Sequence, residues 1–539
     1  MSRRLALRVV ACVVVGAAAV GVGESIFDPP VVDANWTAAV EAELDRSIRA
    51  YPRANAYGGP EALAAELLGD PFRFVLIVGN RLVVDRKLLT TKKGMHHVEF
   101  IRSVMERAPN KNFLYQFEWN ANGANSEDQL VREGCPTPAK MPKTRVKAES
   151  WAMQHHRVPP PRIVIAKRYG YDQCGVMMPN CYFDDVVKWA KAAAKILAES
   201  RQHAFEDRDA RVFWRGAIRR RTECEDEFGN FARAEAVGLT AAHPERFDVR
   251  CIACDVRDDA AHFCEDLQFS PGTRRAVETH GGAAHVNRSV YASYKYQLNL
   301  PGSVSGSYSR NLNHLWMLGS VVALWDAPYV EWYYPALSPK TTHLTVSRET
   351  AYAVLADADA DAALIGRLRA NARRVYDDLL CPDCLDAYWR RLVDGVRDYF
   401  DLGAVLDDPA TLRRVLRGLD FENYELVEFG INGFAGGKSW TTGPSTHTSI
   451  RFISDVDRFL DELAPLPDGG QERKHPGKHK APPSPKKAPK KKGGHHHGHR
   501  YSPKRKQAAF REKMKAAREG ADEEDDVIWD AELATVMAG

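Results

Sequence analysis

The spacing of apolar and polar positions predicts β-strands separated by helices in the first third of the chain. Residues 72–78 and 81–84 are apolar runs separated by Gly79-Asn80, a pair typical of a tight β-hairpin turn. The run NFLYQFEW at 112–119 predicts another strand, and residues 98–107 before it predict a helix.

Strands and helices alternate more regularly in the remainder of the chain. Such alternation predicts an α/β architecture with parallel sheets, because parallel strands need a long crossover between them. The predicted strands are 162–166, 210–214, 248–252, 294–300 and 321–325, and the predicted helices are 184–201 with Asp184 as a cap, 228–237, 309–318, 348–400 and 409–419.

Composition excludes several classes of protein. The 539 residues are 44% apolar and 27% charged, so the chain is neither wholly disordered nor collagen-like, and the length predicts two or three domains. The net charge of +4 is unevenly distributed, because residues 473–518 hold 17 Lys and Arg against one acid, Glu512. The rest of the chain is acidic, with 58 basic and 70 acidic residues, and is not built around a nucleic-acid footprint.

The two ends of the chain predict targeting and attachment. Residues 1–8 contain three arginines and residues 9–22 carry no charge, which is typical of a signal peptide or a short type II anchor, so we expect the body in the secretory lumen. Residues 467–539 are rich in Lys, Pro and His and predict a disordered tail with an acidic end. This tail is either functionally indifferent, a weak metal ligand, or a contact for polyanionic glycans or lipids.

Nine cysteines follow Cys12. In an oxidising lumen we expect a few disulfides and one thiol left over. The pairs Cys251-x-x-Cys254 and Cys381-Pro-Asp-Cys384 could instead ligate zinc or act as a redox couple.

The segment most informative about function is the strand, Gly/Ser-rich loop, helix and strand at 294–325. Ligands of open α/β sheets bind beyond the carboxyl ends of the strands. Gly302 and Gly306 would let the backbone approach a diphosphate, the loop serines add hydroxyl donors, and Arg310 adds a permanent charge. The alternative is a flexible turn with an exposed arginine.

Several motifs here resemble glycosyltransferase family 90, the capsule-associated and protein O-glucosyltransferase family. The resemblance covers roughly residues 110–400. It rests on Tyr294-Lys295-Tyr296, Ser307-Tyr308-Ser309-Arg310, Leu318-Gly319-Ser320-Val321-Val322, Glu331-Trp332-Tyr333-Tyr334-Pro335-Ala336-Leu337, His343, Val212-Phe213-Trp214-Arg215-Gly216 and Met178-Pro179.

The resemblance implies two Rossmann-like domains facing a cleft, the GT-B arrangement. It implies a lumenal, inverting transferase of the endoplasmic reticulum or Golgi that needs no metal or other cofactor. Such an enzyme moves a hexose or pentose, with glucose or xylose expected, from a UDP-sugar to a protein or polysaccharide hydroxyl. The UDP-sugar-binding residues it implies are Arg215, Gly216, Arg219, Ser305, Ser307, Tyr308, Ser309, Arg310 and Glu331, whereas Trp332, Tyr333 and Tyr334 are expected in the core and Tyr294 and Tyr296 in the strand.

Two departures from the family pattern affect the mechanism. The family's arginine would fall at Asn311, one residue after Arg310. The family's catalytic aspartate would fall near Asn120, and an amide cannot act as a base. We expect Glu118 as the base, with Asp128 second. There are two alternatives to a transferase. One is a non-catalytic relative that binds a glycan or a nucleotide, and the other is a scaffold that binds polyanions through its basic tail.

The expected domain organisation has five parts. They are a signal peptide or anchor at 1–27, an acceptor-side α/β domain at 28–205, a UDP-sugar-binding domain at 206–400, helices packing back on the body at 401–466, and the tail at 467–539.

Overall fold

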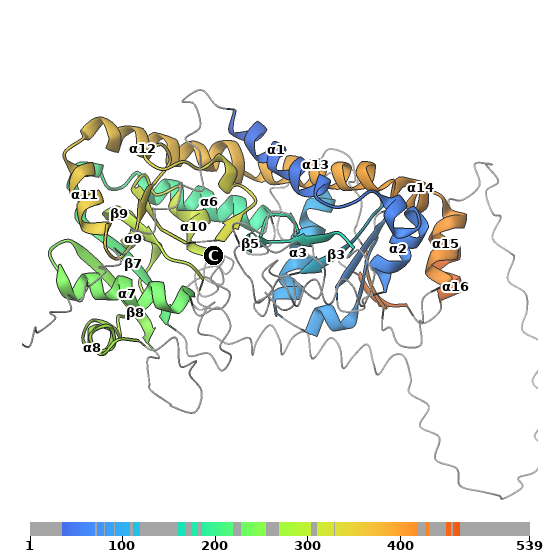
Figure 1. Ribbon diagram of the computed structural model, residues 1–539, viewed down its shortest axis with the longest axis horizontal. Helices are drawn as coiled ribbons and strands as arrows, with labels where there is room; N and C mark the ends of the chain where they lie inside the picture. Colours follow the sequence, from blue (N-terminus) through green and yellow to red (C-terminus); the bar gives the residue numbers. More distant parts are fainter. Residues whose placement is uncertain are drawn as a thin grey trace, which may run out of the picture.

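The computed structural model consists of two lobes, each built on one β-sheet (Figure 1). The residues that the structure describes are 35–69, 73–79, 81–90, 92–107, 111–118, 160–168, 175–180, 183, 186–218, 228–254, 269–302, 310–327, 329–418, 426–430, 449–453 and 456–463. The predicted signal segment and the predicted tail lie outside them.

The first lobe is built on a seven-stranded mixed sheet in the order β14-β13-β2-β1-β3-β4-β6. The predicted hairpin is confirmed, because β1 pairs antiparallel with β2 on either side of the Gly79 turn. Only β3, β4 and β6 run parallel. The strands are β1 (Phe74–Val78), β2 (Arg81–Asp85), β3 (Phe113–Glu118), β4 (Arg162–Val164), β6 (Val176–Met177), β13 (Leu426–Gly430) and β14 (Ser449–Phe452).

Two strands near the end of the chain were not predicted. We expected residues 401–466 to add helices only, and helices are present there, but β13 pairs antiparallel with β2 and β14 extends the sheet beyond it. The predicted strand at 162–166 is also interrupted, because β5 (Ala166–Arg168) leaves the first sheet after β4.

The second lobe is built on a five-stranded parallel sheet in the order β12-β10-β9-β7-β8. In chain order this is 2-1-3-4-5, the arrangement of flavodoxin-like doubly wound sheets. The strands are β7 (Asp209–Ile218), β8 (Phe247–Cys254), β9 (Tyr294–Asn299), β10 (Val321–Trp325) and β12 (Leu344–Val346).

Both faces of this sheet are buried, and alternate residues supply two separate cores. Val212, Trp214 and Leu298 belong to one core. It is completed by α7 (Phe228–Ala242), α11 (Ala351–Asp359) and the first half of α12 (Ala362–Val375). Phe213 and Val322 face the other way and join a core that continues through the first lobe. The two lobes are therefore joined by apolar packing.

A helical rod spans both lobes (Figure 1). It consists of α12 (Ala362–Val375), one π-helical turn (Tyr376–Leu380) and α13 (Pro382–Phe400). Trp389 of α13 contacts the rings of Phe100 and Tyr115 in the first lobe. The remaining helices are α1 (Trp36–Arg49), α2 (Pro60–Leu68), α3 (Lys92–Arg107), α6 (Val186–Ser200), α7 (Phe228–Ala242), α8 (Pro271–His280), α9 (Arg288–Ala292), α10 (Arg310–Leu315), α11 (Ala351–Asp359), α14 (Gly403–Leu406), α15 (Pro409–Arg417) and α16 (Val456–Leu463).

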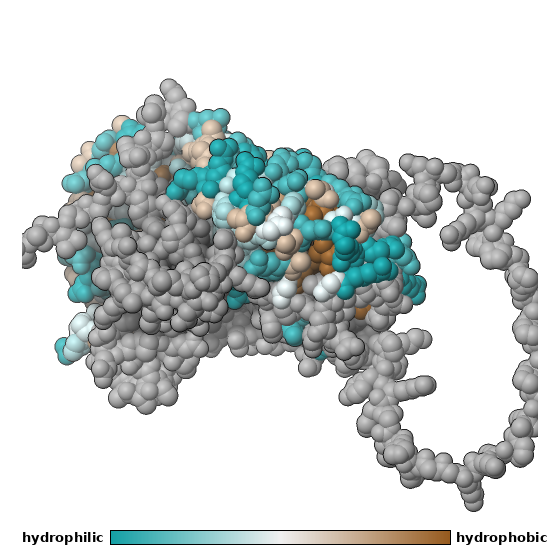
Figure 2. Space-filling view, turned by 45° about the vertical axis from the view of Figure 1, so that its right-hand side comes forward, coloured by the Kyte–Doolittle hydropathy of each residue, from teal (hydrophilic) through white to brown (hydrophobic). Residues whose placement is uncertain are grey.

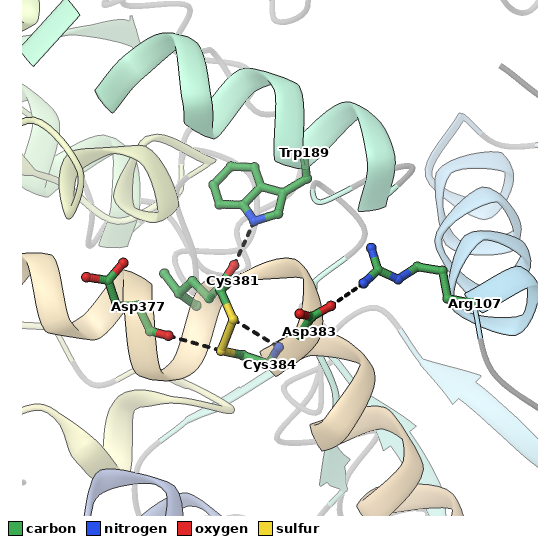
Figure 3. The surroundings of a disulfide bond; sticks show 7 residues. Arg107, Trp189, Asp377, Cys381, Asp383 and Cys384 are labelled. Carbon is green, nitrogen blue, oxygen red and sulfur yellow. Dashed lines mark hydrogen bonds and ion pairs between the residues drawn. A yellow bond between two sulfur atoms is a disulfide. The ribbon is translucent and has the colours of Figure 1, made fainter. Parts of the chain in front are cut away.

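A disulfide lies where this rod passes from the π turn to α13 (Figure 3). Cys381 bonds to Cys384, and its sulfur accepts a hydrogen bond from the Cys384 amide at 3.1 Å, so it also caps the helix. Arg107 of α3 pairs with Asp383, and Trp189 of α6 donates to the Leu380 carbonyl at 2.7 Å. The junction is thus held to helices on both sides of it.

Cys251 and Cys254 form a second disulfide inside β8. The expectation of disulfides is confirmed for these two Cys-x-x-Cys pairs. All the other cysteines lie outside the described residues.

On the face shown in Figure 2, most of the coloured residues are hydrophilic, with a smaller hydrophobic patch among them. Among the described residues, Tyr352 is a large apolar side chain that is 47% exposed. No helix in the described ranges is long and apolar enough to cross a membrane.

The predicted α/β class with parallel sheets is confirmed. The GT-B arrangement of two Rossmann-like domains stays a prediction, because four of the seven strands of the first sheet pair only antiparallel.

Close packing at Gly216 leads to a stability prediction. A Cβ there would lie 2.4 Å from the Trp214 ring, so Gly216→Ala should lower the free energy of unfolding by about 1–3 kcal/mol. Gly238 of α7 has open space around it, and Gly238→Ala should raise that free energy by up to about 1 kcal/mol. Urea denaturation of the two variants checks both signs. Equal stabilities would contradict the packing around Gly216.

Candidate functional site

The strand order locates a ligand-binding edge in the second lobe. In doubly wound sheets, ligands bind beyond the carboxyl ends of the strands where the winding direction reverses. Here the reversal falls between β7 and β9, which end at Ile218 and Asn299. Arg310 begins α10 shortly after β9. Arg219, Ser305, Ser307, Tyr308 and Ser309 follow these strand ends in sequence and lie outside the described residues.

Arg233 of α7 ties the two strand ends together. Its guanidinium donates to the carbonyl of Ala217 in β7 and, at 2.9 Å, to the carbonyl of Pro301 just after β9. It also lies over the Trp214 ring at 5.7 Å. Sequence reasoning missed this residue, because nothing in a helical arginine indicates which carbonyls it will reach.

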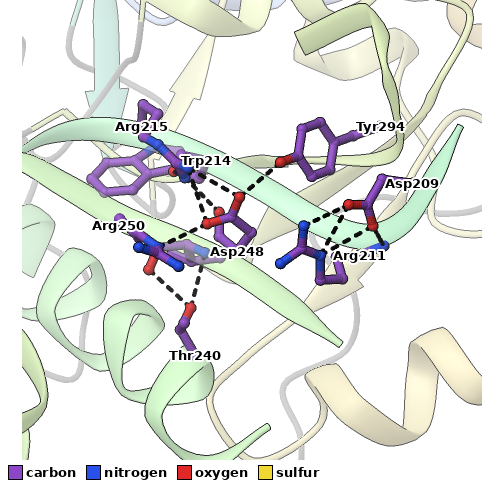
Figure 4. Close-up of polar contacts among 9 residues, drawn as sticks. Asp209, Arg211, Trp214, Arg215, Thr240, Asp248, Arg250 and Tyr294 are labelled. Atoms are coloured by element: carbon purple, nitrogen blue, oxygen red, sulfur yellow. Dashed lines mark hydrogen bonds and ion pairs between the residues drawn. The ribbon is translucent and has the colours of Figure 1, made fainter. Parts of the chain in front are cut away.

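Arg215 forms a buried ion pair with Asp248 (Figure 4). Its Nη2 lies 3.0 Å from both carboxylate oxygens of Asp248, and its Nη1 donates to the carbonyls of Asp248 and Trp214. The Tyr294 hydroxyl donates to the same carboxylate at 2.8 Å. Burial alone would raise the pKa of Asp248, but the hydrogen bonds from Arg215 and Tyr294 outweigh it and hold that pKa below its ordinary value.

Gly216 follows Arg215 in β7, where the Trp214 ring covers its backbone. The glycine is required for this packing. The predicted donor roles of Arg215 and Gly216 stay predictions.

Gly319 and Ser320 serve the opposite, amino edge of the sheet. Gly319 has φ +67°, a conformation that favours glycine, and the Ser320 hydroxyl donates to the Tyr294 carbonyl at 2.8 Å. Arg208 donates to the Leu318 carbonyl and to Ser320 Oγ at 2.8 and 2.9 Å. These motif residues close a turn into β10 and do not reach the ligand edge.

Glu331 lies in a short ribbon that links the lobes. It ends β11 (Tyr329–Glu331), which pairs antiparallel with β5 of the first-lobe segment. The carboxylate is completely buried and accepts a hydrogen bond from Asn180 at 2.9 Å. Burial raises the pKa of Glu331 to about 8, and the bond from Asn180 opposes this shift only in part.

The aromatic residues after Glu331 are core residues, as predicted. Trp332, Tyr333 and Tyr334 are 1%, 0% and 8% exposed. Tyr294 and Tyr296 are buried in β9, also as predicted. Burial likewise lowers the pKa of His343 to about 3, so this motif residue is neutral and hydrogen-bonds to neighbouring threonines.

Glu118, the first candidate base, is the last residue of β3. It pairs in register with Val164, the last residue of β4, and β5 begins two residues later. Glu118 thus ends a strand beside the segment that crosses to the second lobe. Asp128 lies outside the described residues.

The family model of glycosyl transferase family 90 matches residues 148–392. This part of the chain belongs to glycosyltransferase family 90. The match runs from before β4 into α13 and includes the whole five-stranded sheet, so the family assignment and the candidate ligand edge coincide.

The family match indicates glycosyltransferase activity in general. Such an activity requires that the protein bind a sugar donor and an acceptor. Glu118 and Asp128 precede the matched residues. No curated protein matches the chain.

The Arg215–Asp248 pair predicts a pH-dependent contribution to stability. Removing one partner of a buried pair typically costs about 3–5 kcal/mol, so Asp248→Asn should lower the free energy of unfolding by that order at pH 7. Because the pKa of Asp248 is lowered on folding, its contribution is complete above the unfolded value near 4 and is lost as the pH falls through the folded value.

Denaturation at pH 7, 5 and 3 measures this effect. The difference in free energy of unfolding between wild type and Asp248→Asn should become smaller only at the lowest pH. Asp209→Asn is the matched control, since its pair with Arg211 is about one-third exposed and should contribute about 1 kcal/mol or less. Equal losses in the two variants would contradict the assigned importance of the buried pair.

Burial of Glu331 predicts a dependence of stability on pH that is opposite in sign to that of Asp248. Its pKa is higher in the folded state, so the native protein loses stability as the pH rises from the ordinary value near 4.3 to about 8. Glu331→Gln should remove that loss, and its stability relative to wild type should grow by about 1.4 kcal/mol for each unit of pKa shift. Parallel stability profiles of the two proteins from pH 5 to 8.5 would contradict a buried, protonated Glu331.

Proposed function

We propose that this protein transfers a hexose or pentose, with glucose or xylose expected, from a UDP-sugar to a hydroxyl group of a protein or polysaccharide. The observation that carries the proposal is the coincidence of the family 90 match with a complete 2-1-3-4-5 sheet. In that topology, the edge between β7 and β9 is where a nucleotide binds. The candidate donor residues Arg219, Ser305, Ser307, Tyr308, Ser309 and Arg310 follow these two strands in sequence.

The acceptor reaction needs a base. In the proposed inverting step, the Glu118 carboxylate takes the proton of the acceptor hydroxyl, whose oxygen attacks the anomeric carbon as the bond to the UDP oxygen breaks. The position of Glu118 at a strand end beside the interlobe segment supports it as the first candidate. Asp128 remains the second.

We further propose that the reaction takes place in the lumen of the endoplasmic reticulum or Golgi, without metal or another cofactor. The two disulfides support an oxidising compartment. The absence of a metal requirement is an expectation from the family, and activity that persists in a chelator would support it.

A non-catalytic glycan- or nucleotide-binding protein is the second candidate. Asn120 is the residue nearest the position where the family pattern has its aspartate, and this observation favours loss of the base. Calorimetric binding of UDP without turnover, across a broad panel of acceptors, would identify this function.

UDP release is the direct test of the proposed transfer. A thermal-shift screen of UDP-glucose, UDP-xylose and UDP-galactose selects the donor, and release of UDP is then measured with an acceptor panel. Glu118→Gln should keep donor binding and reduce turnover at least about 100-fold. Glu245→Gln, an exposed surface change, should leave turnover unaltered. Full turnover in Glu118→Gln would remove Glu118 from the mechanism.

A further inference from the structure

Asn299 is the last residue of β9, the central strand of the parallel sheet. It is 7% exposed, and its side-chain oxygen Oδ1 is buried without a hydrogen-bond partner in the described part of the chain. Buried polar groups in native proteins are almost always paired, so this buried oxygen at a strand end is a candidate contact for a ligand.

Two further polar atoms of the same kind lie nearby. Gln297, two residues earlier in β9, is fully buried, and its Oε1 also has no partner among the described residues, although its amide nitrogen donates to the Tyr291 carbonyl. Phe213 of β7 pairs in register with Gln297, and Arg215 and Asn299 are each two residues further along the same side. Arg215 Nε is the third buried atom that lacks a partner in the described ranges.

The position of Asn299 fits a ligand site. Asn299 lies at the carboxyl end of β9, beside β7, where the strand order predicts binding. The Gln297 amide and the Arg215 guanidinium lie further back along the strands, where they bond to the Tyr291 carbonyl and to Asp248. Arg233, on the opposite face, holds the Ala217 and Pro301 carbonyls and so fixes both strand ends. At the amino edge, by contrast, Ser320 and Arg208 are fully engaged with each other and with carbonyls.

We propose that Asn299 is a specificity-determining residue whose Oδ1 accepts a hydrogen bond from a hydroxyl group of the bound sugar nucleotide. An amide oxygen is an acceptor, so it binds O–H or N–H groups and not the diphosphate oxygens. The ribose and the transferred sugar both carry such hydroxyls. The inference rests on the proposed function, because that function supplies the hydroxyl-bearing ligand.

A ligand-binding role and a structural role of Asn299 differ in their effect on stability. Replacing an unpaired buried amide by an apolar side chain of similar size removes a group that costs free energy in the unliganded protein. Asn299→Leu should therefore leave the Tm of the unliganded protein unchanged or raise it, while the ligand loses its acceptor.

The experiment compares wild type, Asn299→Leu and Thr240→Val. Thr240 of α7 is buried like Asn299, but its hydroxyl is satisfied by the backbone of Val249 at 2.9 Å in both directions. Thr240→Val should lower the Tm and leave affinity unchanged. Asn299→Leu should lower the affinity for UDP-glucose, measured by calorimetry, at least about tenfold without a fall in Tm. If the affinity for UDP falls as well, Asn299 contacts the nucleoside. If the affinity for UDP is unchanged, Asn299 contacts the transferred sugar.

Asn299→Leu with wild-type affinity for both ligands would overturn the proposal, as would a Tm lowered as far as in Thr240→Val. If the wild-type protein binds neither UDP nor UDP-glucose, the proposed donor is wrong. The Tm of the unliganded Asn299→Leu variant then tests whether Asn299 has a structural role. An unchanged or higher Tm in Asn299→Leu then keeps Asn299 as an acceptor for another hydroxyl-bearing ligand, and a lower Tm rejects it.

Discussion

The central strand β9 is buried on both faces, and this constraint determines how polar side chains can be used throughout the second lobe. Water cannot satisfy a polar group there, so each must find a partner in the protein or in a ligand. At the amino end of the strand the requirement is met internally, since Ser320 donates to Tyr294 and Arg208 donates to Ser320. At the carboxyl end it is not met, because Asn299 Oδ1 has no partner among the described residues. The asymmetry gives the sheet one closed edge and one edge suited to binding.

The lobes are joined in a way that makes this edge part of a larger unit. The core that covers one face of the second sheet continues into the first lobe, and the rod of α12 and α13 crosses between them. Ala166 of β5 pairs with Glu331 of β11, so the chain that follows β4 is tied to the second lobe as well. Glu118 ends the strand beside β4. A base at Glu118 and a donor at the second sheet would therefore belong to two lobes that share one hydrophobic core.

Local pattern was sufficient for the elements whose signal is local. The unit from β9 to β10 was predicted from an apolar strand, a helix with one apolar face and a second apolar strand, and the β1–β2 hairpin from its turn. The pairing of β13 with β2 joins residues more than 300 positions apart, and neither strand's periodicity encodes its neighbour. The same limit applies to the site. Arg310 and Glu331 were predicted from motifs, and their roles stay predictions. The contacts of Arg233 and Asn299 depend on which carbonyls or strands lie beside them after folding.

Arg215 illustrates how the structure changes the meaning of a motif residue. Both terminal nitrogens of its guanidinium are engaged with Asp248 or a backbone carbonyl. A direct contact of those nitrogens with a diphosphate would take Arg215 away from the buried Asp248 carboxylate, which would keep only Arg250 and Tyr294 as partners among the described residues. Breaking a buried ion pair in this way is unfavourable. Nε is the remaining donor and is buried, and Arg215 lies on the same face of the sheet as Gln297 and Asn299. Arg215 can therefore assist donor binding through Nε or by fixing the end of β7, while its charge stays committed to Asp248.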